Sequence, residues 1–195
     1  SLPGTRARER YDNLGPALQK ADTMGRIVSA YIRFMDRSSH LLGVVLAWTL
    51  LAMTLLTSLI VALRYGFNIG SIALQEAVTY LHGTAFMLGA THALQSGSHV
   101  RVDILYRRMS RRSRAWVDSL GAILFLLPLC ALLCIASWGY VGRAFTMREG
   151  SPDPGGLAVL YLLKSLLIVA PVLLALQGVA ELLRHGRRLL RPHAP

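Results

Sequence analysis

The sequence predicts an all-α integral membrane protein with four transmembrane helices, and two observations carry this prediction. Of the 195 residues, 53% are hydrophobic and only 16% are charged, whereas a soluble domain has about 25% charged residues. The apolar residues gather in four stretches, at 41–63, 72–94, 116–140 and 157–183, and roughly 20 apolar residues cross a bilayer core. A soluble four-helix bundle would need a polar stripe on every helix, and three of these stretches lack one.

The distribution of positive charge predicts that both ends of the chain lie in the cytoplasm. Residues 1–37 carry seven Lys and Arg, the segment 95–115 carries six, and the tail after residue 183 carries four. The other two loops carry one and two. Short loops rich in Lys and Arg stay on the cytoplasmic side, and an even number of crossings returns the chain to the side where it began.

The segments outside the spans have different predicted structures. Residues 1–20 are expected to be disordered, and residues 21–38 to form an amphipathic helix on the cytoplasmic membrane surface, because their apolar and basic side chains alternate with helical spacing. Asp103 is expected to cap a second short interfacial helix. Residues 39–185 then form a single transmembrane domain, residues 186–195 form a basic tail, and the stretch 151–156 forms a turn.

The predicted second span contains the charged residue Glu76, and the predicted fourth span contains Lys164. Charges in hydrocarbon cost roughly 2.5 to 3.5 kcal/mol each on insertion scales, so each needs a partner or an escape to the surface. Their depths match to within about 5 Å, and we hypothesise that they pair with each other or jointly with a partner subunit. The alternative is that each side chain reaches the headgroups separately.

The second stretch is the most polar of the four, and we predict that it is the helix most enclosed by protein. At 100° per residue, Ala85, Gly89 and Ala93 share one side with His82 and His92. Small residues at every fourth position let membrane helices approach closely. Glu76, Thr79 and Gly83 fall on the opposite side of the helix.

Several classes of function find no support in the sequence. There is no GxSxG, HExxH or phosphate-binding loop, so no enzyme is predicted. Cys130 and Cys134 match no zinc pattern. The net charge is +11, but the basic residues gather beside the apolar segments. This position indicates cytoplasmic flanks of membrane spans and not a nucleic-acid site. A haem-binding membrane cytochrome needs two facing histidines, and His82 has no central counterpart in another span. We therefore expect no cofactor and no metal.

An ordered set of short motifs resembles the small membrane subunit, the DctQ-like component, of tripartite ATP-independent periplasmic (TRAP) transporters. The resemblance covers roughly residues 30–185 and includes the four-span plan. Its residues are Arg64-Tyr65 with Phe67, Gln75-Glu76 with Tyr80, Leu88-Gly89-Ala90, and Gly97-Ser98-His99-Val100-Arg101-Val102-Asp103. Of these, the resemblance makes Arg64, Tyr65, Glu76, Tyr80, Gly89, His99, Arg101 and Asp103 candidates for the family motif or for a partner interface.

The resemblance implies a scaffold in the bacterial inner membrane. The chain would pack against a large membrane subunit that holds the substrate and sodium sites, and it would help to dock a periplasmic solute-binding protein that captures an organic acid or similar solute. Arg143, Arg148 and Glu149 are the candidate docking residues, although they could equally be solvated loop charges. Membrane lipid is the remaining expected partner. The alternatives are the small subunit of a tricarboxylate-type tripartite transporter, a haem protein, and an anchor for a soluble enzyme.

Overall fold

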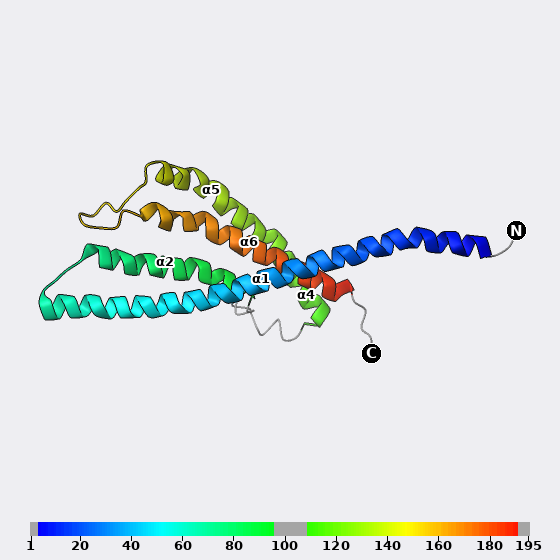
Figure 1. Ribbon diagram of the computed structural model, residues 1–195, viewed down its shortest axis with the longest axis horizontal. Coiled ribbons are helices and arrows are strands. Elements are labelled where there is room, and N and C mark those ends of the chain that lie inside the picture. The colour runs from blue at the N-terminus through cyan, green and yellow to red at the C-terminus, as the bar shows by residue number, and fades with distance from the viewer. Residues whose placement is uncertain (1–3, 96–108, 191–195) are drawn as a thin grey trace.

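The computed structural model describes residues 4–95 and 109–190, and every regular element among them is helical. The elements are α1 (Gly4–Phe67), α2 (Ile72–Gln95), α4 (Arg111–Gly121), the π-helical segment η1 (Ala122–Leu126), α5 (Leu127–Thr146) and α6 (Leu160–Leu190) (Figure 1). The prediction of an all-α protein is confirmed for these residues. His99, Arg101 and Asp103 lie outside the described residues, and so does the proposed Asp103 cap.

Three helical stretches in the described part of the chain are long and apolar enough to cross a membrane. They are Thr23–Phe67, Trp116–Thr146 and Leu160–Arg187, and they contain the predicted first, third and fourth spans. The helix α2 matches the predicted second span within one residue at its end but is not among the three, because polar side chains interrupt it. The structure therefore supports three spanning helices by length and composition, and the fourth crossing stays a prediction.

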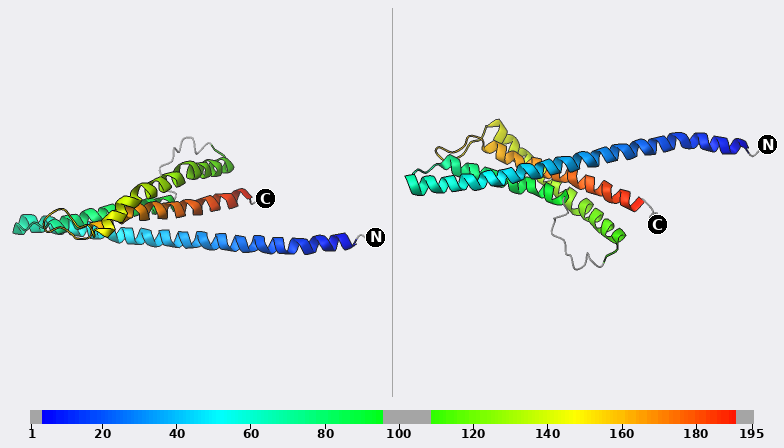
Figure 2. Two further views of the ribbon diagram at one scale, coloured as in Figure 1. Left: turned by 90° about the horizontal axis from the view of Figure 1, so that it is seen from above. Right: turned by 60° about the horizontal axis from the view of Figure 1, so that its bottom comes forward.

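The first helix differs from the sequence prediction. We expected a disordered segment, a separate interfacial helix and then a span, whereas α1 is one helix of 64 residues from Gly4 to Phe67. Most residues in 4–20 are Ala, Arg, Glu, Leu, Gln or Lys, which have high helix propensity. Between Arg26 and Leu63 the chain has no proline that would end the helix. The N-terminal part of α1 consequently extends beyond the other helices (Figure 2).

The helices form two antiparallel pairs that lie side by side, α1 with α2 and α5 with α6 (Figure 1). The helix α6 contacts α1, α2, α4 and α5. It also supplies several of the most buried residues, including Ala170, Gln177 and Ala180. The prediction that α2 is the most enclosed helix is therefore wrong for the chain by itself. The helix α6 contacts both members of the other pair as well as α5, whereas α2 has one exposed side.

The passage from α4 to α5 has one irregularity with a clear cause. Residues Ala122–Leu126 are π-helical and end two positions before Pro128, whose ring and missing N–H disturb the preceding turn. Gly178 of α6 packs here. A Cβ atom at this position would lie 2.7 Å from Cδ2 of Leu126, so a larger residue here would require the Leu126 side chain to move.

Candidate functional site: the α5–α6 loop and the faces of α2

The loop between α5 and α6, residues 147–159, is held by a carboxylate from another helix. Glu76 lies in the second turn of α2, and its Oε2 accepts a hydrogen bond from the backbone N–H of Leu157 at 2.6 Å. Its Oε1 accepts a hydrogen bond from the hydroxyl of Ser151. Ser151 N also donates to the Leu157 carbonyl at 2.9 Å. Glu76 therefore attaches both sides of the loop, at Ser151 and at Leu157, to α2.

Gly156 makes this contact possible. A Cβ atom at residue 156 would lie 2.8 Å from Oε1 of Glu76 and closer still to the Ser151 hydroxyl. Any side chain would push the carboxylate and the loop apart, since real Cβ atoms do not come this near a neighbour. The sequence analysis predicted only a turn at residues 151–156. The structure shows in addition that this segment is shaped to receive the Glu76 carboxylate.

A second ionic contact fixes the start of the same loop. The Nζ atom of Lys164 on α6 lies 2.6 Å from Oε1 of Glu149 and 4.3 Å from the centre of the Tyr140 ring, where a cation is attracted to the π face. Both backbone polar groups of Glu149 are hydrogen-bonded. Its N–H donates to Ala144 O at 3.0 Å, and its carbonyl accepts from Tyr161 N at 3.1 Å.

The two charges that we expected to pair thus have different partners. Lys164 binds Glu149, and Glu76 binds Ser151 and Leu157. Both charges hold the same loop, so they act near each other but through separate contacts. Glu149 is engaged with Lys164 and is half-buried, which leaves Arg143 and Arg148 as the exposed members of the predicted docking set.

Arg148 also has an unusual backbone conformation. Its φ angle is 46°, in the left-handed region that few non-glycine residues adopt. It directly follows the last turn of α5, where Met147 N donates to Arg143 O at 3.0 Å and Arg148 N donates to Phe145 O at 3.2 Å. Arg148 lies two residues after the end of α5, where the chain turns into the loop, and its side chain is exposed.

One face of α2 packs closely against α1. A Cβ atom on Gly43 of α1 would lie 2.7 Å from the His92 ring, so glycine at 43 provides the space for that imidazole. His92 Nδ1 forms a 2.9 Å hydrogen bond with the carbonyl of Ser39. Gly89, from the predicted stripe with Ala85 and Ala93, also faces α1, since a Cβ atom on it would lie 4.0 Å from Cδ1 of Leu46.

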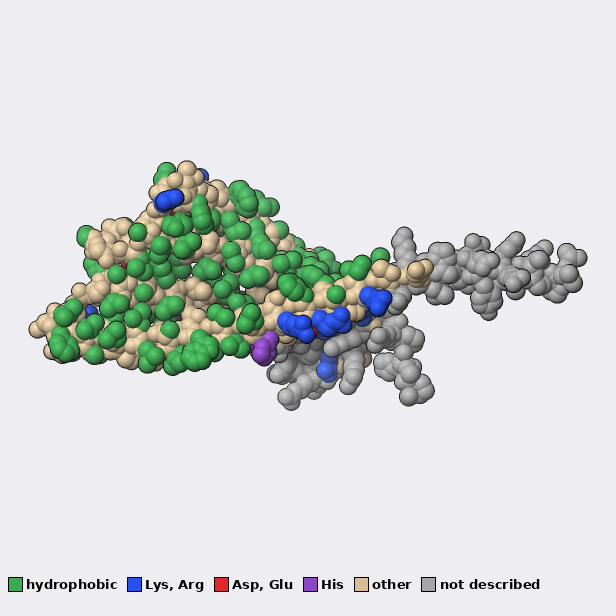
Figure 3. All heavy atoms as spheres, viewed as in Figure 1, with side chains coloured by type: hydrophobic (Ala, Val, Ile, Leu, Met, Phe, Trp, Pro, Cys, Tyr) green, Lys and Arg blue, Asp and Glu red, His purple; other side chains and the backbone are tan. Residues whose placement is uncertain are grey.

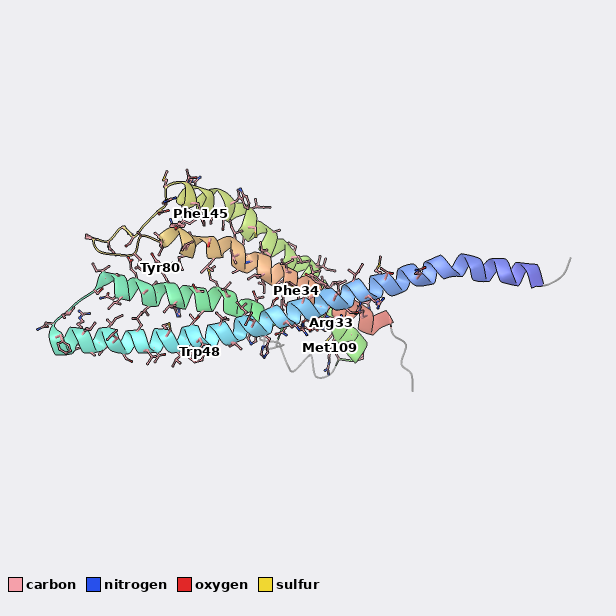
Figure 4. The ribbon with its side chains drawn as sticks, in the orientation of Figure 1. Arg33, Phe34, Trp48, Tyr80, Met109 and Phe145 are labelled. Carbon is pink, nitrogen blue, oxygen red and sulfur yellow. The ribbon has the colours of Figure 1, made fainter. Side chains whose placement is uncertain are left out.

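Another face of α2 packs on α6, and it carries Gly83 from the side that was predicted to lie opposite the small-residue stripe, whereas Thr79 from that side is exposed. A Cβ atom on Gly83 would lie 3.2 Å from Cδ1 of Leu163, which shows how closely the two helices approach. Tyr80 lies on α2 between the two helix pairs (Figure 4), and its buried hydroxyl has no hydrogen-bond partner in the described part of the chain. Arg64 and Tyr65, at the end of α1, are exposed.

A third face of α2 is open. Its residues recur with a spacing of three or four, and all are exposed: Ile72, Gln75, Thr79, His82 and Phe86. We call these five residues the open face. Phe86 is 78% exposed. The Thr79 hydroxyl donates to Gln75 O at 3.2 Å, whereas the side chains of Gln75 and His82 make no hydrogen bond to any described residue.

A group of polar contacts between α1 and α6, at the end of the bundle away from the α5–α6 loop, was not expected from the sequence. Arg184 of α6 forms an ion pair with Asp36 of α1 at 2.5 Å, and Ser39 donates a hydrogen bond to Oε1 of Gln177 at 3.1 Å. Gln177 is 1% exposed. Arg187 donates to Ser29 at 3.1 Å. The available signals were an acid within a basic segment, Asp36, and a lone amide within an apolar run, Gln177.

These features define a multi-pass, all-α membrane protein whose polar contacts organise a loop and helix packing. A family model for the tripartite ATP-independent periplasmic transporters, DctQ component, matches residues 53–188. The chain belongs to this family, which confirms the resemblance inferred from the sequence motifs.

One relative gives a more detailed comparison. The C4-dicarboxylate TRAP transporter small permease protein DctQ of Vibrio cholerae serotype O1 is 31% identical to this chain over 114 residues, which are 56% of this chain and 49% of the relative. The match therefore spans about half the length of that protein. No solved structure matches the chain.

Proposed function

We propose that this chain is the small scaffold subunit of a sodium-coupled TRAP-type transporter in the bacterial inner membrane, and that it is not an enzyme. In this assignment it packs against the large membrane subunit, which holds the sodium and substrate sites. It also helps to dock a periplasmic solute-binding protein. The family match supports the class of transporter, and the open face of α2 is the observation that carries the scaffold role.

The open face fits a protein partner better than lipid. Gln75 and His82 offer hydrogen-bonding groups along α2, and a hydrocarbon chain cannot satisfy them. Membrane helices associate through such polar side chains and through close packing. A helix of the large subunit that carries a complementary polar side chain would satisfy both groups and cover the exposed Phe86.

We further propose that α2 makes the fourth crossing. It has 24 residues, which give about 36 Å of helix, and it lies antiparallel to α1 and against α6, both of which contain candidate spans. With four crossings, the basic segments at both ends of the chain fall on one side, which favours the cytoplasm. The α5–α6 loop then lies in the periplasm.

The α5–α6 loop is the proposed docking surface for the solute-binding protein. Glu76 and Lys164 hold its backbone in one conformation, and a rigid loop loses little entropy when a partner binds. Arg148 is exposed on the loop and Arg143 is exposed in the last turn of α5 beside it, and the two charges favour an acidic patch on the partner. The name of the Vibrio cholerae relative specifies C4-dicarboxylates, and we propose an organic acid as the solute class here.

Co-purification tests the scaffold role. The tagged chain is co-expressed with the large subunit encoded in the same organism, and recovery of that subunit is measured in mild detergent. We expect the double variant Gln75→Leu with His82→Leu to reduce recovery at least several-fold. The control is Thr57→Leu with Ser58→Leu, which removes two exposed hydroxyls from α1 and is expected to leave recovery unchanged. Equal recovery with both variants would exclude the open face as the site of packing.

A further inference from the structure

One outward face of α1 changes abruptly from apolar to basic. Val44, Trp48, Leu51 and Leu55 are spaced by three or four residues, so they lie on one side of the helix, and they are 45%, 67%, 48% and 62% exposed. We call these four residues the apolar row. No other described element covers this side of the helix, which faces away from α2 and α6.

The same side continues toward the N-terminus with cations. Arg33, Arg37 and His40 keep the spacing of four, three and four that leads to Val44, and all three are exposed. We call them the basic row. None of them has an ion pair or side-chain hydrogen bond to a described residue. Figure 3 shows Lys and Arg side chains gathered along α1 beside a histidine, where the continuous hydrophobic surface ends.

The buried side of α1 lies opposite both rows. Met35, Ser39 and Leu46 are 8%, 3% and 7% exposed, and at 100° per residue they fall about half a turn away from Arg37 and Val44. The neighbouring acid Asp36 is already bound to Arg184. The positive charge of the basic row is therefore directed outward and is not neutralised within the described part of the chain.

The position of the two rows along α1 matches the layers of a membrane. The stretch 41–63 has no charged residue and is about 34 Å long, which is close to the thickness of the hydrocarbon core. His40 and Arg37 then fall at headgroup depth. The apolar row, from Val44 to Leu55, extends for about 16 Å, which is about half of the core and so the depth of one leaflet.

From this pattern we propose that the outward face of α1 binds an anionic phospholipid. The acyl chain lies along the apolar row and the phosphate contacts Arg37 and His40, with Arg33 close by. An anionic lipid has the same order of apolar and charged parts as the helix face, over the same length, and with the opposite charge. The proposal depends on α1 crossing the membrane and not on the transport function of the chain.

The fluorescence of Trp48 can report directly on lipid bound at this face, because Trp48 lies within the apolar row. Figure 4 labels both Arg33 and Trp48 on α1. The chain has three tryptophans, so Trp116→Phe and Trp138→Phe leave Trp48 as the only indole. This protein is reconstituted in phosphatidylcholine bilayers that contain a small, equal fraction of either phosphatidylglycerol or phosphatidylcholine with acyl chains brominated at mid-chain. Bromine quenches a nearby indole, so quenching reports which lipid contacts Trp48.

We expect brominated phosphatidylglycerol to quench Trp48 more strongly, with a relative affinity roughly five-fold or more above that of phosphatidylcholine, because each cation near an anionic headgroup contributes about a factor of five. In the same background, Arg33→Gln with Arg37→Gln should bring the ratio close to one. The control pair Arg143→Gln with Arg148→Gln removes two exposed arginines from the other end of the helices and should leave the ratio unchanged.

Two further results decide the proposal independently of how the variants fold. In the unmodified Trp48 protein, the ratio should fall as ionic strength rises, because salt screens exposed charges. Co-purification with the large subunit should leave quenching of Trp48 by brominated lipid intact. Equal quenching by the two lipids, a ratio that survives loss of both arginines, or loss of quenching in the complex would overturn the proposal, the last because a protein then covers this face.

Discussion

The carboxylate of Glu76 on α2 accepts a hydrogen bond from the backbone N–H of Leu157, at 2.6 Å, across 81 positions of sequence. The same carboxylate also binds Ser151. An acidic side chain in the second turn of α2 thus holds a loop from the other helix pair. The conformation of residues 147–159 depends on α2 as well as on α5 and α6.

The first prediction concerns this hydrogen bond. Glu76→Ala removes the acceptor, and we expect the Leu157 amide to exchange its hydrogen roughly ten-fold faster or more, because hydrogen bonds to charged groups contribute about 1.5–3 kcal/mol. Hydrogen exchange of the peptide that covers residues 150–160 measures the change. Gln75→Ala, at the exposed neighbouring position, is the control and should leave this peptide unchanged. Unaltered exchange in Glu76→Ala would show that the carboxylate does not hold the loop.

The second prediction tests the fit of Gly156. Gly156→Ala places a methyl group against Glu76 and Ser151, and overpacking of this kind costs about 1–3 kcal/mol. Equilibrium unfolding in mixed detergent micelles should show this loss. Gly142→Ala is the matched control, since nothing lies within 4 Å of a Cβ there. If Ser151→Gly fails to recover part of the loss, the steric account is wrong.

The third prediction separates the observed ion pair from the one expected from the sequence. A double-mutant cycle with Lys164→Met and Glu149→Gln should give a clear coupling free energy of unfolding, since the two groups are 2.6 Å apart. The cycle that combines Lys164→Met with Glu76→Gln should give a much smaller one. The opposite order of the two couplings would favour the Glu76–Lys164 pair instead.

The fourth prediction concerns the packing of α1 against α2. Gly43→Ala forces a methyl group into the His92 ring and should destabilise the chain by about 1–3 kcal/mol. In a His92→Ala background the same change should cost much less, because the ring is gone. Gly66→Ala on the same helix meets nothing within 4 Å and serves as the control. An equal cost in both backgrounds would show that the ring does not limit the approach of the helices.

Sequence patterns predicted the helices well, because a run of about 20 apolar residues is interpretable without knowing its neighbours. The angular projection of α2 was also informative. It placed Gly83 and Gly89 on different sides, and the structure packs Gly83 against Leu163 of α6 and Gly89 against Leu46 of α1. His82 and Thr79 are exceptions, since both lie on the open face. His82 does not lie with His92 against α1, and Thr79 does not lie with Gly83 against α6.

The partners of individual charges could not be predicted in this way. Matching Glu76 with Lys164 by depth treats the helices as parallel rods and ignores the loops. The α5–α6 loop folds back and offers a backbone N–H at Leu157 and a carboxylate at Glu149, which are closer partners than a side chain on another helix. The continuous α1 was missed for a related reason, since the change from polar to apolar composition near residue 40 contains no proline that would end the helix.

Site-specific photo-crosslinking tests the central claim, that α2 carries the contact with the large membrane subunit. A photoreactive phenylalanine analogue replaces His82 or Phe86 on the open face, or Ile135 on α5, which is 75% exposed, and each variant is irradiated in membranes that contain the large subunit. Our account predicts a crosslinked product of the two subunits from positions 82 and 86 and none from position 135. Crosslinking to the large subunit from position 135 alone would contradict it.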